Sequence, residues 1–219
     1  KITTTEEQEL LEKSDEIIRK LDKESATRIF SSQNMKKFFY ILAVLVSLYH
    51  LYTATFGPPV TLKNRSLHVG MMMSMAFMMY PFSKKSDFTK VSWMDWIWVI
   101  LSCIIPIYVW VDYMGIVDRT GMPDTIDVVM STILVVSLLE ASRRVTGNAL
   151  PILSVIFIIY GLFGREMPSI FFHRGYDWNI LSNHLFANTE GIYGTSVAVS
   201  SSYIFLFILF GSVMGKSGM

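Results

Sequence analysis

The sequence predicts an all-α integral membrane protein with about six transmembrane helices. Hydrophobic residues make up 52% of the 219 residues, and the mean hydropathy is +0.42. Both values exceed what an ordinary soluble domain carries. The apolar residues also cluster in runs close to the length that crosses the hydrocarbon core of a bilayer. The net charge of +1 gives no reason to expect a nucleic-acid partner.

Residues 1–35 are polar and carry a pattern that is typical of an amphipathic helix. Thr5 and Gln8 fit a capping box at its start. The residues on its apolar face are Leu10, Leu11, Ile17, Ile18 and Leu21. The polar face lacks the excess of Lys and Arg that anchors a helix on a membrane surface. We therefore expect a cytoplasmic helix that packs on this protein or on a partner.

Six apolar runs follow this segment. The predicted spans are Phe38–Phe56, Ser66–Phe82, Trp96–Val111, Thr125–Arg144, Val145–Phe163 and Thr195–Met214. Tryptophans flank the third run at both ends, as in the aromatic belts at the two membrane–water interfaces. The basic pairs 36/37, 84/85 and 143/144 all fall on one side of the membrane if the N-terminus is cytoplasmic. The positive-inside rule therefore predicts a cytoplasmic N-terminus.

Features that carry catalysis or conduction are not evident. The sequence has no nucleophile elbow, phosphate-binding loop or zinc spacing, so we expect no enzyme activity, cofactor or metal site. The central parts of the predicted spans carry no Asp, Glu, Lys or Arg, which proton relays and ion paths usually contain. These spans are therefore interpreted as scaffold rather than as a conduction route.

A metal site with methionine or histidine ligands is a weaker alternative to the scaffold interpretation. Thioethers can bind Cu(I), but flexible apolar packing is the favoured interpretation of a methionine-rich helix. The methionines concerned are Met71, Met72, Met73, Met75, Met78 and Met79. His50 and His68 are too few for a confident metal site, so we interpret them as polar anchors near the outer interface.

Glu140, Arg143 and Arg144 form the first candidate site. Helical spacing lets Glu140 reach Arg143 at i,i+3 or Arg144 at i,i+4. One interpretation is a positive-inside anchor with a local ion pair. The other is a buried polar lock between two parts of a larger protein, and the sequence leaves both open.

The segment between the last two predicted spans, residues 171–194, contains a predicted interfacial helix. Asp177 can cap a helix that starts at Trp178. Trp178, Leu181 and Leu185 would share one face of that helix. The asparagines expected largely away from this face are Asn179, Asn183 and Asn188.

Two glycines follow this predicted helix. Gly191 can end it, and Gly194 can permit a further turn. The segment is either a static interfacial loop or an arm that joins a fixed scaffold to a moving domain, with both glycines as hinge candidates. Metal binding is disfavoured because the spacing of its acidic and imidazole side chains does not suit one site. These side chains are His173, Asp177, His184 and Glu190.

Two stretches, Leu138–Gly164 and His173–Gly218, carry motifs that occur together in one family. The motifs are E-A-x-R-R before A-L-P-I-L, then H-R-G-Y, T-E-G-I-Y-G and F-x-F-x-L-F-G-x-x-M-x-K-S-G. They resemble the fused permease subunits of tripartite ATP-independent periplasmic (TRAP) transporters. The resemblance is strongest to the 4TM/12TM fusions that work with TAXI-type binding proteins.

The resemblance implies a sodium-coupled secondary importer of organic acids or related anions in a bacterial or archaeal inner membrane. A periplasmic TAXI-type protein would deliver the substrate, Na⁺ would be the coupling ion, and the mechanism would be of the elevator type. Residues 36–144 would form the small Q-like scaffold, and residues 145–219 would begin the large M-like region. The family's ion and substrate ligands lie in re-entrant hairpins expected after Met219, so none is assigned here. The alternatives are a membrane-anchoring or assembly protein, and a polytopic enzyme or copper-handling protein.

Overall fold

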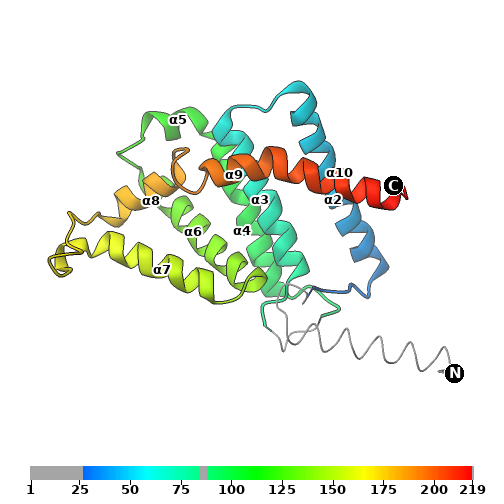
Figure 1. Ribbon diagram of the computed structural model, residues 1–219, viewed down its shortest axis with the longest axis horizontal. Coiled ribbons are helices and arrows are strands. Elements are labelled where there is room, and N and C mark those ends of the chain that lie inside the picture. The colour runs from blue at the N-terminus through cyan, green and yellow to red at the C-terminus, as the bar shows by residue number, and fades with distance from the viewer. Residues whose placement is uncertain (1–26, 84–87, 219) are drawn as a thin grey trace.

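The computed structural model describes residues 27–83 and 88–218, and within these ranges every regular element is a helix (Figure 1). The amphipathic helix predicted for the N-terminal segment falls almost wholly on residues 1–26, outside the described residues. The all-α class predicted from the sequence is confirmed for the described part of the chain.

Four of the described helices are long and apolar enough to cross a membrane. They are α2 (Gln33–Phe56), α4 (Trp93–Val111), α6 (Thr125–Val145) and the continuous helix Thr195–Lys216. The last helix is made of α9 (Thr195–Val199), a π-helical turn η2 (Ser200–Ile204) and α10 (Phe205–Lys216). These four helices indicate a membrane location.

Two of the six predicted spans differ from this description. Helix α3 (Thr61–Met79) begins before the predicted span, and its first turns carry Lys63, Asn64 and Arg65. Helix α7 (Ala149–Leu162) has 14 residues, which gives a length of about 21 Å against a hydrocarbon core of about 30 Å. Both helices therefore fall outside the set of four, and the number of six spans stays a prediction.

The core of the molecule lies where α3, α4 and α6 pack together. Phe77, Ile105 and Leu134 are among its fully buried side chains. Helices α3 and α4 approach closely at Gly70, where an added Cβ would lie 2.7 Å from Pro106 Cγ. Small residues at such crossings let membrane helices pack without a gap.

Three short helices complete the described fold. They are α5 (Tyr113–Asp118), the 3₁₀ turn η1 (Gly164–Glu166) and α8 (Trp178–Phe186). Helix α8 packs against α6 and so belongs to the core.

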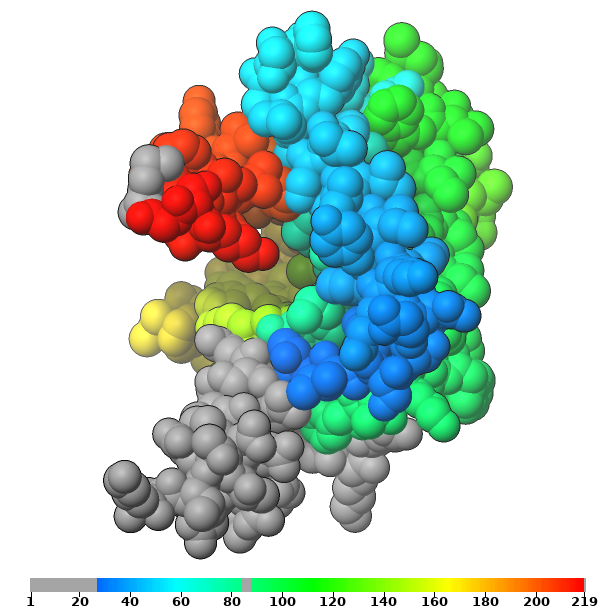
Figure 2. All heavy atoms as spheres, turned by 90° about the vertical axis from the view of Figure 1, so that its right-hand side faces the viewer, coloured from blue at the N-terminus to red at the C-terminus, as the bar shows by residue number. Residues whose placement is uncertain are grey.

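Helices α7 and α10 are the exceptions to this packing. Only Pro151 of α7 is buried, and no residue of α10 is buried. They extend to opposite sides of the core in Figure 1, and Figure 2 shows a hollow between them. These two helices leave long apolar surfaces without a partner among the described residues.

Candidate functional site

Asp95 lies at the centre of a buried ion-pair cluster at one end of the core. It is the N3 residue of a capping box with Ser92, whose backbone N–H donates to Asp95 Oδ2 at 3.1 Å. The same carboxylate accepts hydrogen bonds from Arg28 Nη2 and from Arg144 Nη1, the latter at 2.6 Å. The side chains of Arg28, Asp95 and Arg144 are all 0% exposed.

Glu140 extends this cluster along α6. Arg144 Nε donates to Glu140 Oε1 at 2.7 Å, and Arg143 donates to both carboxylate oxygens at 2.8 Å. Both predicted spacings, i,i+3 and i,i+4, are therefore used at once. We call Arg28, Asp95, Glu140, Arg143 and Arg144 the Asp95 cluster. Its three guanidiniums and two carboxylates leave one net positive charge.

The arginines of the Asp95 cluster also bind the carboxyl end of α3. Arg28 Nη1 donates to the carbonyl oxygen of Met78 at 3.0 Å, and Arg144 Nη1 donates to that of Tyr80 at 3.1 Å. Carbonyl groups in the last turn of a helix lack partners within the helix, so these contacts satisfy them. The cluster therefore joins the segment before α2 to α3, α4 and α6. Its role as a lock between parts of a larger protein stays a prediction.

Arg28 and Asp95 were missed by the sequence analysis. They lie 67 residues apart, and Asp95 lies 49 residues from Arg144. No local spacing reports such contacts. The sequence did contain one usable signal, because Ser92 and Asp95 show the spacing of a capping box before an apolar run.

A second cluster, the Asp127 cluster, ties α4, α5 and α6 together at the opposite end of the core. Asp127 accepts hydrogen bonds from Tyr108 Oη at 2.6 Å and from Arg119 Nε at 2.9 Å. Arg119 Nη2 also donates to Asp112 at 2.6 Å. Hydrogen bonds to Asp127 and then to Asp112 raise the pKa of Arg119 above its ordinary value. Asp124 and Asp127 also form the capping box of α6.

The third cluster is a pair of histidines between α2 and α3. His50 Nδ1 lies 2.8 Å from the carbonyl oxygen of Val46, and His50 Nε2 lies 2.8 Å from His68 Nδ1. His68 Nε2 is 3.1 Å from the hydroxyl of Ser200 in the last helix. The interpretation of His50 and His68 as interfacial anchors is wrong, because both are buried, at 1% and 4% exposure.

The hydrogen-bond partners assign the protons of this histidine pair. A carbonyl oxygen only accepts, so His50 Nδ1 carries a proton and, in the neutral ring, Nε2 accepts from His68 Nδ1. His68 Nε2 then accepts from the hydroxyl of Ser200. Ser200 begins the π-helical turn η2, and such turns are frequent at functional positions. The pair therefore links three helices through one fully bonded polar chain.

The interfacial helix predicted from the sequence begins where expected. Helix α8 starts at Trp178, with Asp177 in the N-cap position, although the Asp177 side chain makes no capping hydrogen bond. Trp178 Nε1 donates to Thr132 Oγ1 of α6 at 3.0 Å. Leu181 and Leu185 are half-buried. The buried residues of α8 are instead Ser182, Asn183 and Phe186, so the face that packs on the core is turned away from the predicted apolar face.

Two further details of the α8 prediction are wrong. The helix ends at Phe186 rather than at Gly191. Asn183 does not lie away from the core but is buried, because its Oδ1 accepts the backbone N–H of Gly121 at 2.9 Å. This contact holds α8 to the loop before α6.

Gly191 and Gly194 lie in a tight loop that is packed on α3 and α8. A Cβ at Gly191 would lie 2.5 Å from the Cα of Leu185. Arg65 Nη1 of α3 donates to the carbonyl oxygen of Tyr193 at 2.6 Å and to that of Gly194 at 3.3 Å. Tyr193 is fully buried, and burial raises its pKa. Neither glycine has a positive φ, so close packing explains Gly191, and a hinge at these positions stays a prediction.

His173 closes the carboxyl end of α7. Its Nε2 lies 2.9 Å from the carbonyl oxygen of Tyr160, and its Nδ1 accepts the backbone N–H of Gly175 at 3.1 Å. Both ring nitrogens are therefore occupied, one by α7 and the other by the H-R-G-Y turn. The residues that the structure describes contain no group of three His, Cys, Asp or Glu placed to hold a metal ion.

The methionines of α3 do not converge on one point. Met71 lines a cavity that is shared with α2 and α4, whereas Met72 and Met73 line a second cavity toward α6. Met78 is fully buried in the core. Their thioethers thus face different surroundings, as packing residues do.

The second of these cavities, of about 430 Å³, is lined by α3, α6 and the start of the last helix. His68 and Ser200 lie on its wall together with apolar side chains such as Met72 and Leu138. Val145, also on the wall, is the last residue of α6 and directly precedes the turn into α7. The last helix therefore begins on the wall of this cavity, and α7 follows Val145 after a short turn. We call this cavity the bay.

No family model, curated protein or solved structure matches the chain. The class of protein therefore rests on the sequence motifs and on the geometry of these clusters.

Proposed function

We propose that the chain is the scaffold part of a membrane permease, in which a rigid core holds two helices that bind a separate transport region. The observation that carries this proposal is the contrast in burial. Three polar clusters and a packed core fix α3, α4, α6 and α8, whereas α7 and α10 bury almost nothing. Contiguous apolar surface of this extent faces either lipid or another protein, and the resemblance to permease subunits favours a protein partner.

The resemblance to TRAP permease subunits gives the proposal its chemistry. Three of the motifs that carry the resemblance also have a structural role. E-A-x-R-R supplies Glu140, Arg143 and Arg144 to the Asp95 cluster, and H-R-G-Y closes α7. T-E-G-I-Y-G packs the loop that leads into the last helix. The proposed activity is sodium-coupled import of organic acids or related anions that a periplasmic TAXI-type protein delivers.

An elevator mechanism needs one part that stays fixed while another moves. The described residues suit the fixed part, because ion pairs tie their helices together at both ends of the core, and those of Asp95 with Arg28 and Arg144 are fully buried. The bay and its two flanking helices would hold the moving part, which the resemblance places after Met219. Residues 36–144 then act as the Q-like scaffold, and residues 145–219 connect it to the M-like region.

A cross-linking experiment tests this assignment in the complete protein. A photoreactive phenylalanine analogue is placed at Phe157 of α7 or at Phe207 of α10, which are 64% and 71% exposed. We expect cross-links to the chain segment after Met219. A matched probe at Val111, which is 83% exposed on α4, should give none. Lipid adducts alone at Phe157 and Phe207 would contradict the proposal.

A membrane-anchoring or assembly protein is the second candidate. It also explains the exposed α7 and α10, because such a protein would bind a partner through them. Substrate flux separates the two candidates, since an assembly protein gives none. Copper handling is less well supported, because the methionines of α3 lie in separate places.

A further inference from the structure

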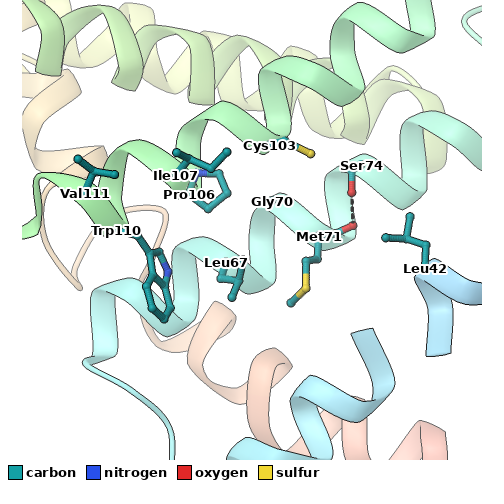
Figure 3. Close-up of a pocket in the computed structure, with 10 residues that line it drawn as sticks. All are labelled: Leu42, Leu67, Gly70, Met71, Ser74, Cys103, Pro106, Ile107, Trp110 and Val111. Atoms are coloured by element: carbon teal, nitrogen blue, oxygen red, sulfur yellow. Dashed lines mark hydrogen bonds between the residues drawn. The ribbon is translucent and has the colours of Figure 1, made fainter. Parts of the chain in front are cut away.

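The first cavity, between α2, α3 and α4, differs from the bay in its chemistry (Figure 3). It has a volume of about 430 Å³, and its lining is almost entirely apolar. The walls come from Leu42 of α2, Met71 of α3 and Ile107 of α4. The hydroxyl of Ser74 donates to the carbonyl oxygen of Met71 at 2.8 Å, so its proton is not free for a ligand. We call this cavity the groove.

Helix α2 contacts the rest of the molecule on either side of the groove. Toward the carboxyl half of α2, Tyr49 Oη donates to Asn64 at 2.8 Å, and His50 binds His68. Toward its amino end, the ring of Phe38 lies 6.3 Å from that of Trp96. Leu42 lies between these contacts in the sequence and lines the groove.

One end of the groove carries a cation and two aromatic rings. Lys63 Nζ lies 5.4 Å from the ring centroid of Trp110 and 5.2 Å from that of Tyr113. Trp110 Nε1 donates to the carbonyl oxygen of Lys63 at 3.1 Å. Lys63 forms no salt bridge with any residue that the structure describes. Trp and Tyr prefer the headgroup level of a bilayer, and Lys extends its ammonium to the same level.

The distance from Lys63 to the far end of the groove matches one leaflet of a membrane. On α3 the groove residues reach Ser74, which lies 11 positions after Lys63. A helix rises about 1.5 Å per residue, so this distance is about 16 Å. Half of a bilayer's hydrocarbon core is about 15 Å. A chain that enters beside Lys63 would therefore reach the middle of the membrane at Ser74.

We propose that the groove binds one acyl chain of a membrane phospholipid, with the phosphate against Lys63 and the headgroup beside Trp110. The apolar lining selects hydrocarbon, and the cation at the interface selects an anionic headgroup. Such a lipid would fill the space between α2 and the core and hold α2 in place. This site is separate from the bay, so it does not depend on the transport reaction.

The experiment uses the complete protein in nanodiscs of phosphatidylglycerol and phosphatidylethanolamine in equal amounts. Cys103 is the only cysteine in these 219 residues and lines the groove. With any cysteine elsewhere in the complete protein replaced by Ser, Cys103 can carry a benzophenone that cross-links to the occupant of the groove. We expect phosphatidylglycerol adducts to exceed phosphatidylethanolamine adducts at Cys103. Lys63→Ala should lower this preference about fivefold, the change expected for one lysine near an anionic leaflet.

Two controls separate the groove from ordinary lipid contact. Leu45→Cys in a Cys103→Ser background places the same label on an exposed position of α2, and its adducts should follow the bulk lipid ratio. Lys37→Ala removes an exposed lysine before the groove and should leave the preference at Cys103 unchanged. Adducts at Cys103 in the bulk ratio, an unchanged preference in Lys63→Ala, or adducts to protein instead of lipid would each overturn the proposal. The proposal remains testable even if a variant fails to fold, because the ratio of phosphatidylglycerol to phosphatidylethanolamine adducts at Cys103 is measured in the wild-type protein.

Discussion

At Asp95 a single carboxylate is the counter-ion of two fully buried guanidiniums. Removing one partner of a buried ion pair leaves an uncompensated charge, which usually costs more than the pair contributed. Substitutions in the Asp95 cluster should therefore lower the free energy of unfolding by different amounts. The loss should be largest for the residue that neutralises the most buried charges.

Asp95→Ala should lower the free energy of unfolding by about 3–5 kcal/mol, because it leaves Arg28 and Arg144 buried without their shared carboxylate. Thermal unfolding in detergent measures the effect. Asp177→Ala is the matched control, since Asp177 is exposed and its side chain makes no capping bond. Equal loss of stability in both variants would show that the Asp95 cluster does not hold the core.

Glu140→Ala should be less damaging than Asp95→Ala, because the Glu140 side chain is 12% exposed and Arg144 keeps Asp95 as a partner. It should still lower the unfolding temperature more than Lys37→Ala, which removes an exposed charge without a salt bridge to any described residue. The same detergent assay ranks the three variants. If Glu140→Ala were as stable as Lys37→Ala, the ion pairs of Glu140 would contribute no more to stability than surface contacts do.

Gly191→Ala should destabilise the protein, since the new Cβ meets the backbone of Leu185 at 2.5 Å and that backbone has to shift. Gly211→Ala is the matched control, because no atom lies within 4 Å of its Cβ and Gly211 lies inside α10. Alanine in a helix should be neutral there or stabilising by up to about 1 kcal/mol. The unfolding temperatures of the two variants decide this, and a tolerated Gly191→Ala would favour a hinge over a packing requirement.

At the scale of single residues, the sequence predicts contacts within one helix and misses those between helices. Glu140, Arg143 and Arg144 were found because three- and four-residue spacings place side chains on one face. Arg28 and Asp95 gave no such signal, since their contacts depend on how distant helices meet. Asn183 was misplaced for the same reason, because its partner Gly121 lies 62 residues away.

At the scale of helices, the histidine pair connects α2, α3 and the last helix. The contributions of His50 and His68 to the free energy of unfolding should therefore depend on each other. We expect a coupling of about 0.5–3 kcal/mol between His50→Ala and His68→Ala in a double-mutant cycle. Unfolding in detergent gives the four free energies that the cycle requires. His50→Ala combined with His184→Ala is the control, since His184 is exposed and binds Asn188. Additive effects of His50→Ala and His68→Ala would show that the two rings act independently.

The helix boundaries show where local signals suffice. Asp177 predicted the start of α8 because an N-cap is a local feature. The early start of α3 was missed because Lys63, Asn64 and Arg65 read as a loop before an apolar run. In the structure these residues contact Trp110, Tyr49 and Tyr193, contacts between helices that the sequence does not show.

At the scale of the whole molecule, the described residues divide into a fixed core and two projecting helices (Figure 1). Apolar runs were enough to predict an all-α membrane protein. They did not show that α7 is short or that no residue of α10 is buried, because composition does not distinguish a helix that faces lipid from one that binds another protein. The distinction matters for the proposed permease, since α7 and α10 would bind its transport region.

The most direct test of the central claim is uptake of radiolabelled organic acids into proteoliposomes that contain the complete protein. The account predicts flux only when an inward sodium gradient and the loaded periplasmic binding protein are both present. Omitting either one should reduce uptake to the level of empty liposomes. Flux that needs neither the sodium gradient nor the binding protein, or no flux with both supplied, would contradict the assignment as a scaffold of a sodium-coupled permease.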